Sequence, residues 1–331
     1  MKLCIVGSSG HYHYVLDPVR CHRDLDLEIA GIAPGSEGEN IEGLRQEVIK
    51  LGYKPLIYED YRSMFDEINP DIAVINCYFG DLAKVSEEAL TRSINVFTEK
   101  PVATTLEDLE KLKKAYERSK KTFVAMLGIR YKPWFLAAHR YVEDGSIGEI
   151  RLLNTQKSYK LGRRGENYKS REVYGGTIPW VGSHGVDWIR WFSREEFVSV
   201  YASHSSKYNR GHGDLEMTAL CHFVLTNEIF ASLTIDYFRP DNAPTHDDDR
   251  LRVVGTKGIV EVIKNKVLLI DGKTPGIREI PLESEGSIFL DFLKEVEGKG
   301  KCLVTAEDSF RVTEVCLKAR QSADEAKVVY L

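Results

Sequence analysis

The chain has 331 residues, 43% of them hydrophobic and 29% charged, with a formal net charge of −5 at pH 7. This length suits two domains with separate cores, and the acidic balance excludes the basic surface typical of proteins that bind nucleic acid or an anionic membrane. No apolar stretch approaches the roughly 20 residues that cross a bilayer. The six cysteines are scattered without a CxxC pair, so we expect a reduced, cytoplasmic protein with no metal site.

The first third of the sequence alternates short apolar runs with helical patterns. The runs lack polar–apolar alternation, which is typical of parallel strands covered on both faces. We expect strands at residues 2–6, 27–33, 55–58, 71–75, 96–98 and 122–126, and helices at 40–51, 61–68, 81–93 and 105–119. Thr105 and Asp108 nearly form a capping box at the start of the last helix. This order predicts an α/β fold, with an N-terminal Rossmann domain, a doubly wound parallel sheet, over residues 1–123.

From about residue 124 the pattern changes to alternating strands. A helix is expected at 133–144, followed by strands at 150–158, 198–203, 217–225, 228–237, 251–254, 258–263 and 266–270. Apolar and polar residues alternate over 229–235, which indicates a sheet with one buried face. Residues 124–331 are therefore predicted to form an α+β domain with an open, mainly antiparallel sheet. The helical segment 306–324 could belong to either domain.

A glycine turn, Gly7-Ser8-Ser9-Gly10, follows the first strand and precedes a helical stretch. Glycines there let the backbone approach a pyrophosphate, and the helix N-terminus favours its negative charge. Ser9 and Tyr12 replace the second and third glycines of the full fingerprint, so a turn without function would have the same pattern. We expect Gly7, Ser8, Ser9, Gly10 and His11 to bind the cofactor.

The second strand ends in 32–36 without the carboxylate that usually holds the ribose hydroxyl of NAD, and the next charges are Glu37 and Glu39. No arginine follows closely, as an NADP site would require. The expected cofactor is NAD or NADP, with a slight preference for NAD.

Two further segments carry candidate chemistry. Glu99-Lys100-Pro101 ends an apolar run, and such a charged pair before proline often only terminates a strand in solvent. Gly175-Gly176 precedes a helix on which His184 and Asp187 lie about one turn apart. A lone histidine on such a helix is more often structural, but the glycines before it would let the backbone approach a ligand.

These motifs, in their order, resemble the glucose–fructose oxidoreductase / inositol dehydrogenase / MocA-type family of NAD(P)-dependent oxidoreductases. The shared features are the glycine turn, Glu99-Lys100-Pro101, Arg130 with Pro133, the segment 145–150, Gly175-Gly176 with His184, and the segment 255–258. The resemblance implies a Rossmann domain followed by an open sheet whose outer face joins subunits. It therefore implies a homo-oligomer, a dimer or tetramer, that acts on a small sugar-like molecule.

The resemblance also assigns roles to individual residues. In that family the lysine of the Glu-Lys-Pro motif lies between cofactor and substrate, so Lys100 would stabilise the developing alkoxide and His184 would act as the base. Glu99 would orient the nicotinamide or Lys100. Cys77 and Tyr78 stand in the family's cofactor-side segment. The expected substrate-binding residues are Lys100, Tyr159, Arg163, Trp180 and His184.

The chain departs from the family at Trp180, where family dehydrogenases commonly have an aspartate four residues before the histidine. His184 would then need another carboxylate, from Asp187 or from the acidic run Asp247-Asp248-Asp249, which is more typical of a solvated turn. The run from Lys160 to Arg164 could bind a carboxylate or phosphate on a sugar, or it could be a charged surface loop.

The predicted function is hydride transfer between a nicotinamide and a secondary alcohol or ketone of a sugar, cyclitol or sugar acid. Two alternatives are a glycosidase that uses tightly held NAD and a non-catalytic NAD(P)-binding regulatory protein. The presence of both Lys100 and His184 favours an enzyme.

Overall fold

The computed structural model describes all 331 residues, which divide into two compact units. The first unit comprises residues 1–128, 172–175 and 287–313, and the second comprises 129–171, 176–286 and 314–331. The expected boundary at residue 123 lies close to the end of the first segment. A single cut does not describe the division, because two later segments return to the first unit, and one border falls within helix α10 (Ala306–Glu325).

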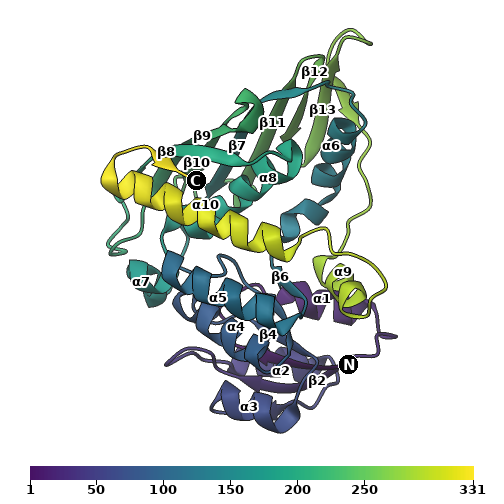
Figure 1. Ribbon diagram of the computed structural model, residues 1–331, viewed down its shortest axis with the longest axis vertical. Helices are drawn as coiled ribbons and strands as arrows, with labels where there is room; N and C mark the ends of the chain where they lie inside the picture. The colour runs from purple at the N-terminus through teal and green to yellow at the C-terminus, as the bar shows by residue number, and fades with distance from the viewer. The chain divides into compact units, whose positions relative to one another are not determined.

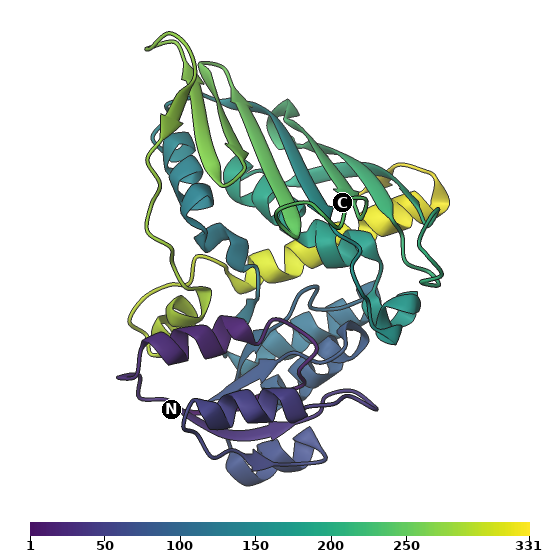
Figure 2. The same cartoon turned by 180° about the vertical axis from the view of Figure 1, so that it is seen from behind.

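The first unit is built on a parallel six-stranded sheet with the strand order β3-β2-β1-β4-β5-β6, which is the doubly wound Rossmann order predicted from the sequence. The strands are β1 Lys2–Val6, β2 Glu28–Ala33, β3 Leu56–Ile57, β4 Ile72–Ile75, β5 Asn95–Thr98 and β6 Phe123–Ala125. All residues of β4 are buried, because helices cover both faces of the sheet. Figure 1 shows α4 and α5 on one face, and Figure 2 shows α1 and α2 on the other.

Four helices of the first unit, α2 to α5, begin and end close to the predicted positions, whereas α9 was not predicted. The helices of this unit are α1 His13–Cys21, α2 Glu42–Lys50, α3 Tyr61–Ile68, α4 Leu82–Thr91, α5 Leu106–Ser119 and α9 Ile288–Val296. A short helix at Phe79–Asp81 lies within the unit, and two more, Gly128–Tyr131 and Arg171–Tyr174, lie at its borders. Thr105 caps α5, since its hydroxyl accepts the N–H of Asp108 at 3.1 Å. Helix α9 brings Phe289 and Phe292 against Phe97 of β5, with ring centroids 5.5 and 5.1 Å from that ring. This aromatic contact is why a late segment packs with the Rossmann sheet.

The second unit contains a nine-stranded sheet with the order β14-β13-β12-β11-β7-β10-β9-β8-β15. Only β7 and β10 pair in parallel, so the prediction of a mainly antiparallel sheet is confirmed. The strands are β7 Ile150–Tyr159, β8 Phe197–Ser205, β9 Thr218–Leu225, β10 Phe230–Asp236, β11 Asp247–Gly255, β12 Gly258–Ile263, β13 Lys266–Asp271, β14 Arg278–Ile280 and β15 Val329–Tyr330.

Helices cover one face of this sheet and leave the other open. Helix α6 (Pro133–Glu143) packs on β12 and β13, and α8 (Ser183–Ser193) packs on β7 and β10, preceded by short helices at Glu166–Lys169 and Ile178–Gly182. Figure 2 looks onto the uncovered face. Leu220, Tyr201 and Phe230 lie exposed there, on β9, β8 and β10. None of the chain's helices combines the length and apolar composition that crossing a membrane demands.

Candidate functional site

The glycine turn after β1 packs directly against the chain that follows β4. Gly7 has a φ of 79°, and a Cβ added to it would lie 2.5 Å from the backbone of Cys77, so only glycine fits there. A Cβ on Gly35 would lie equally close to the Cys77 side chain. Cys77 is buried, and burial raises the pKa of its thiol well above the ordinary value. Its side chain therefore packs beneath the turn, and the cofactor contact expected of Cys77 stays a prediction.

Glu39 closes one side of the turn. Its carboxylate accepts the N–H groups of Ser8 at 2.9 Å and Ser9 at 3.1 Å, the hydroxyl of Ser9 at 2.6 Å, and the N–H of Gly35 at 3.1 Å. Glu39 is only 9% exposed, although it comes from the loop after β2. No carboxylate stands at the end of β2 itself, and Glu39 reaches the same place from further along the loop, a role that its position in the sequence did not reveal.

Glu99 closes the other side. Its Oε2 accepts the backbone N–H of His11 at 2.7 Å and lies 2.6 Å from the His11 Nδ1, while its Oε1 accepts the N–H of Lys100 at 2.9 Å. Burial alone would raise the pKa of Glu99, but His11 and Lys100 outweigh it and lower this pKa to about 2. An ionised carboxylate at the end of β5 thus ties the glycine turn to Lys100, whose bond to Pro101 is cis.

Donors and acceptors without protein partners remain beside the turn. The backbone oxygen of Asn76 accepts the N–H groups of Ser9 and Gly10 at 2.8 and 3.0 Å. The side-chain amide of Asn76 is fully buried, yet neither its nitrogen nor its oxygen has a hydrogen-bond partner. The N–H groups of Tyr12 and His13, at the N-terminus of α1, donate to no acceptor of the protein.

These groups fit a dinucleotide. They lie after β1 and β4, where the strand order reverses and where sheets of this kind bind ligands. The N-terminus of α1 would hold a pyrophosphate, and the Asn76 amide would offer a donor and an acceptor to a polar group of the cofactor. Sequence reasoning did not single out Asn76, although a polar residue directly after a buried strand could have signalled it. Tyr78, which was expected here, donates its N–H to the Ser36 hydroxyl at 3.1 Å.

In the second unit, the two glycines precede the helical segment that carries Trp180 and His184. Gly175 and Gly176 have φ values of 83° and 100°. The carboxylate of Glu216 fixes the following residue, because it accepts the N–H of Thr177 at 2.9 Å. His184 is 5% exposed at the start of α8. The two candidates for its orienting carboxylate both have a cationic partner.

Asp187 forms a buried ion pair with Arg130. The guanidinium Nε lies 3.0 and 3.1 Å from the two carboxylate oxygens, and Nη2 lies 2.5 Å from Oδ1. Asp249 lies 2.5 Å from the ammonium of Lys157. The acidic run 247–249 is the start of strand β11, so the interpretation as a solvated turn was wrong for Asp249. Its carboxylate is needed inside to compensate Lys157, which is fully buried.

Aromatic rings gather around Trp180, which is buried. Its ring centroid lies 4.5 Å from that of Tyr168 and 6.1 Å from that of Tyr237. Tyr159 lies 6.2 Å from Tyr237. The guanidinium over these rings belongs to Arg164, whereas the expected Arg163 is exposed.

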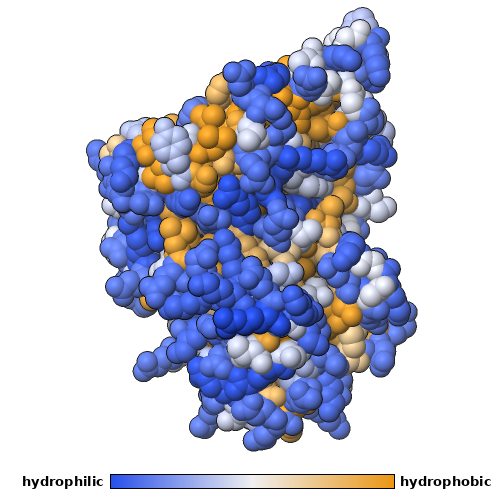
Figure 3. Space-filling model, in the orientation of Figure 1, coloured by the Kyte–Doolittle hydropathy of each residue, from blue (hydrophilic) through white to orange (hydrophobic).

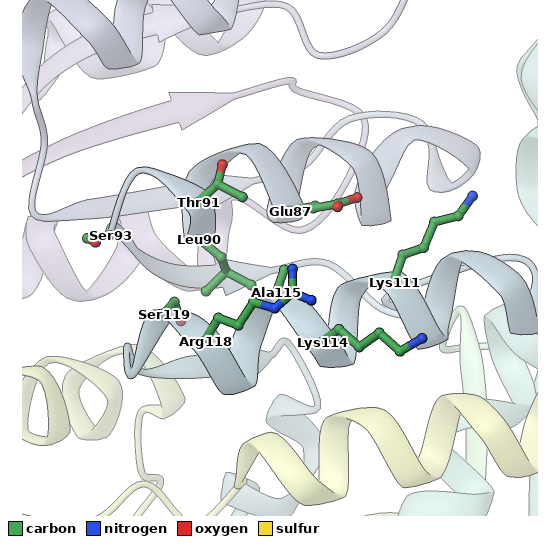
Figure 4. A pocket seen from close by; sticks show the side chains of 9 residues that line it. All are labelled: Glu87, Leu90, Thr91, Ser93, Lys111, Lys114, Ala115, Arg118 and Ser119. Carbon is green, nitrogen blue, oxygen red and sulfur yellow. The ribbon is translucent and has the colours of Figure 1, made fainter.

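A separate surface pocket of about 410 Å³ lies between α4 and α5 (Figure 4). Lys111, Lys114 and Arg118 line it, in a region whose surface is mostly hydrophilic (Figure 3). Ser93, which also lines it, comes two residues before the start of β5. The pocket therefore lies toward the amino ends of the strands, opposite the edge where the glycine turn lies, and we assign it no part in the site.

Comparisons with known proteins agree with this arrangement. A family model described as an oxidoreductase family with an NAD-binding Rossmann fold matches residues 1–127, and one described as the GFO/IDH/MocA C-terminal domain matches residues 135–261. The solved structure of a "putative oxidoreductase" from Thermotoga maritima is 53% identical, covers 100% of both chains and has a TM-score of 0.96.

Two curated relatives are more distant. The inositol 2-dehydrogenase of Klebsiella pneumoniae is 20% identical over 308 residues, which cover 87% of this chain and 86% of that protein. The uncharacterised oxidoreductase YrbE of Bacillus subtilis is 27% identical over 202 residues, and the alignment covers 61% of this chain but only 58% of that relative. Both halves of the molecule match models of one family, and the chain belongs to the GFO/IDH/MocA family of oxidoreductases.

Proposed function

We propose that the protein is an NAD-dependent oxidoreductase that transfers a hydride between a nicotinamide and a secondary alcohol or ketone of a sugar, cyclitol or sugar acid. The observation that carries this proposal is the linkage through Glu99. One buried carboxylate bonds both to the glycine turn, through His11, and to the backbone of Lys100. Lys100 therefore lies at the strand edge where the cofactor turn lies. The likeness to a protein named inositol 2-dehydrogenase supports a substrate that is oxidised at a secondary hydroxyl group.

Each residue would have a defined task in that reaction. When bound, the nicotinamide would take up the hydride from the carbinol carbon. The Lys100 ammonium would donate a hydrogen bond to the substrate oxygen and stabilise the negative charge that grows on it. His184 would accept the hydroxyl proton and release it to solvent. Glu99, whose carboxylate is kept ionised by His11 and Lys100, would hold Lys100 in a fixed position relative to the turn.

The test is a substrate screen combined with a lysine variant. Purified protein with NAD and a panel of polyols, sugars and sugar acids is followed at the absorbance of reduced nicotinamide. On the substrate so found, Lys100→Ala should lower turnover on the order of a hundredfold, comparable to the loss of one oxyanion donor, with little effect on NAD affinity. Near-normal turnover of this variant would contradict the assignment. Cleavage of a glycoside without net formation of reduced nicotinamide would point to the glycosidase alternative.

We also propose that Glu39 makes the protein prefer NAD to NADP. Its carboxylate lies beside the turn and the end of β2, where the adenosine ribose binds in Rossmann folds. A 2′-phosphate would meet this charge, and two unit charges about 4 Å apart repel by roughly 1 kcal/mol in water and about 4 kcal/mol near a protein surface. We therefore expect NAD to bind at least roughly fivefold more tightly than NADP.

Calorimetry with both cofactors tests this preference. Glu39→Gln should narrow the difference between NAD and NADP, whereas Glu37→Gln, which removes the same charge from an exposed side chain two positions earlier, should leave it unchanged. An unchanged preference in Glu39→Gln would contradict the proposal.

The homo-oligomer expected from the resemblance is proposed to form through the uncovered face of the nine-stranded sheet, which carries exposed Leu220, Tyr201 and Phe230. The cytoplasmic location stays a prediction.

A further inference from the structure

Arg164 lies in the second unit within a frame of three aromatic rings. The central carbon of its guanidinium is 5.1 Å from the ring centroid of Trp180, 5.4 Å from that of Tyr237 and 5.8 Å from that of Tyr168. The electron-rich faces of such rings attract a cation at these distances. The guanidinium is thus positioned by ring packing.

The protein does not compensate the charge of Arg164 with a carboxylate. The guanidinium forms no ion pair, and Nη2 donates only a long hydrogen bond, 3.3 Å, to the carbonyl oxygen of Lys160. Its Nε is buried and has no hydrogen-bond partner. Lys157, whose ammonium is also close to aromatic rings, is by contrast paired with Asp249 at 2.5 Å. A buried donor without an acceptor costs free energy unless a ligand satisfies it.

A second cation without a carboxylate partner lies on the same segment. The ammonium of Lys160 donates to the carbonyl oxygens of Asp241 and Ala243 at 2.8 and 2.6 Å and makes no ion pair. Nearby, His246 stacks on Tyr159 with ring centroids 5.1 Å apart. Burial and the charge of Arg164 lower the pKa of His246, in spite of the neighbouring Asp247. The surroundings of Arg164 therefore favour an added negative charge.

Trp180 contacts this cation without compensating its charge. The chain has tryptophan at the position where the family motif described above has an aspartate. Tryptophan supplies a ring instead, which holds the cation in place without neutralising it.

We propose that Arg164 binds an anionic group of the substrate, so that the substrate is a sugar acid or a sugar phosphate and not a neutral polyol. This proposal rests on the proposed function, whose substrate class it narrows. A guanidinium presents paired N–H donors that match the two oxygens of a carboxylate or phosphate. The faces of Trp180 and Tyr237 would contact the apolar side of the sugar ring.

Calorimetry with matched ligands tests the proposal. Wild-type protein and Arg164→Gln are titrated, with and without NADH, with glucose, glucuronate, gluconate and glucose 6-phosphate. In the wild type, at least one anionic sugar should bind on the order of tenfold to a hundredfold more tightly than glucose, the range for a hydrogen-bonded charged group. Tighter binding of glucuronate or gluconate would indicate a sugar acid as substrate, and tighter binding of glucose 6-phosphate would indicate a sugar phosphate. Arg164→Gln should abolish the preference, and Arg164→Lys, which keeps the charge without the paired donors, should restore part of it.

Two controls separate binding from folding and charge. Arg210→Gln removes an exposed arginine in the same unit and should leave the preference unchanged, and melting curves show whether each variant folds. If no anionic sugar binds more tightly than glucose, or if the preference survives in Arg164→Gln, the proposal is overturned. Calorimetry needs no turnover, so it tests this inference separately from the proposed function. If anionic sugars bind selectively but no NAD is reduced, the proposed oxidoreductase activity alone is refuted. If neutral polyols are turned over and anionic sugars are not preferred, only the role of Arg164 is refuted.

Discussion

Replacing Asp187 by asparagine tests whether this carboxylate stabilises the second unit or orients His184. Arg130 is 2% exposed and Asp187 is fully buried, and their groups make contacts of 2.5, 3.0 and 3.1 Å. Asparagine keeps the shape of the side chain but removes its charge, so the buried Arg130 guanidinium loses the negative charge of this carboxylate. Breaking a buried pair in this way costs about 3–5 kcal/mol.

Urea unfolding followed by tryptophan fluorescence measures this loss. All four tryptophans, at positions 134, 180, 188 and 191, lie in the second unit, so their emission reports the unfolding of that unit. The matched control is Glu261→Gln, which breaks the pair with Arg252 on the sheet's uncovered face, where the two side chains are 34% and 40% exposed. Such a partly exposed pair contributes about 1 kcal/mol or less.

A double variant separates charge from packing. Arg130→Met with Asp187→Leu removes both ions and should recover most of the stability lost by Asp187→Asn, because well-packed apolar groups replace a buried pair at little cost. The reasoning fails if Asp187→Asn loses no more stability than Glu261→Gln. If turnover then falls while stability holds, Asp187 acts on the chemistry and its pairing with Arg130 is incidental.

Two further predictions follow from burial and exposure. Because the folded pKa of Glu99 is about 2, below its ordinary 4.5, its contribution is complete above about pH 4.5 and is lost as the pH falls toward 2. Glu99→Gln should therefore be less stable than the wild type at pH 7 by about 3 kcal/mol. Melting curves followed by circular dichroism should show that this difference in stability shrinks toward pH 2. An equal difference at pH 3 and pH 7 would count against the low pKa of Glu99. Phe230→Asp on the uncovered sheet face should dissociate the proposed homo-oligomer, as measured by light scattering, while Tyr208→Asp, on an exposed loop, should not. A wild-type protein that is monomeric at micromolar concentration would contradict this prediction.

The Rossmann sheet could be predicted from the sequence because its signals are local. Runs such as 72–75 are apolar throughout, and a strand buried on both faces needs no other residue to be recognised. The cap of α5 was equally visible, since Thr105 and Asp108 are three residues apart. The return of 287–313 to the first unit was not visible, because it depends on Phe97 meeting rings far away in sequence.

Long-range pairing also limited the prediction of the site. Arg130 is 57 residues from Asp187, and Lys157 is 92 residues from Asp249, so neither ion pair follows from sequence spacing. Between adjacent Arg163 and Arg164, only the path of an irregular loop decides which side chain meets the rings, and no periodicity describes such a loop. The role of Glu39 was not predicted for the same reason, because its side chain folds back from a loop onto the glycine turn.

The hydrogen bonds of Glu39 mean that cofactor choice and local folding depend on one side chain. An engineer who wished to convert the protein to NADP would remove this negative charge first. Glutamine at position 39 keeps one oxygen in place of two, so it can accept from Ser8 or from Gly35 but not from both, and the converted protein would unfold more readily around β1 and β2. A successful conversion therefore needs a second neutral acceptor near position 39 before an arginine for the 2′-phosphate is added. Cofactor preference in this chain is thus costly to change in a single step, even if the rest of the site accepts either nucleotide.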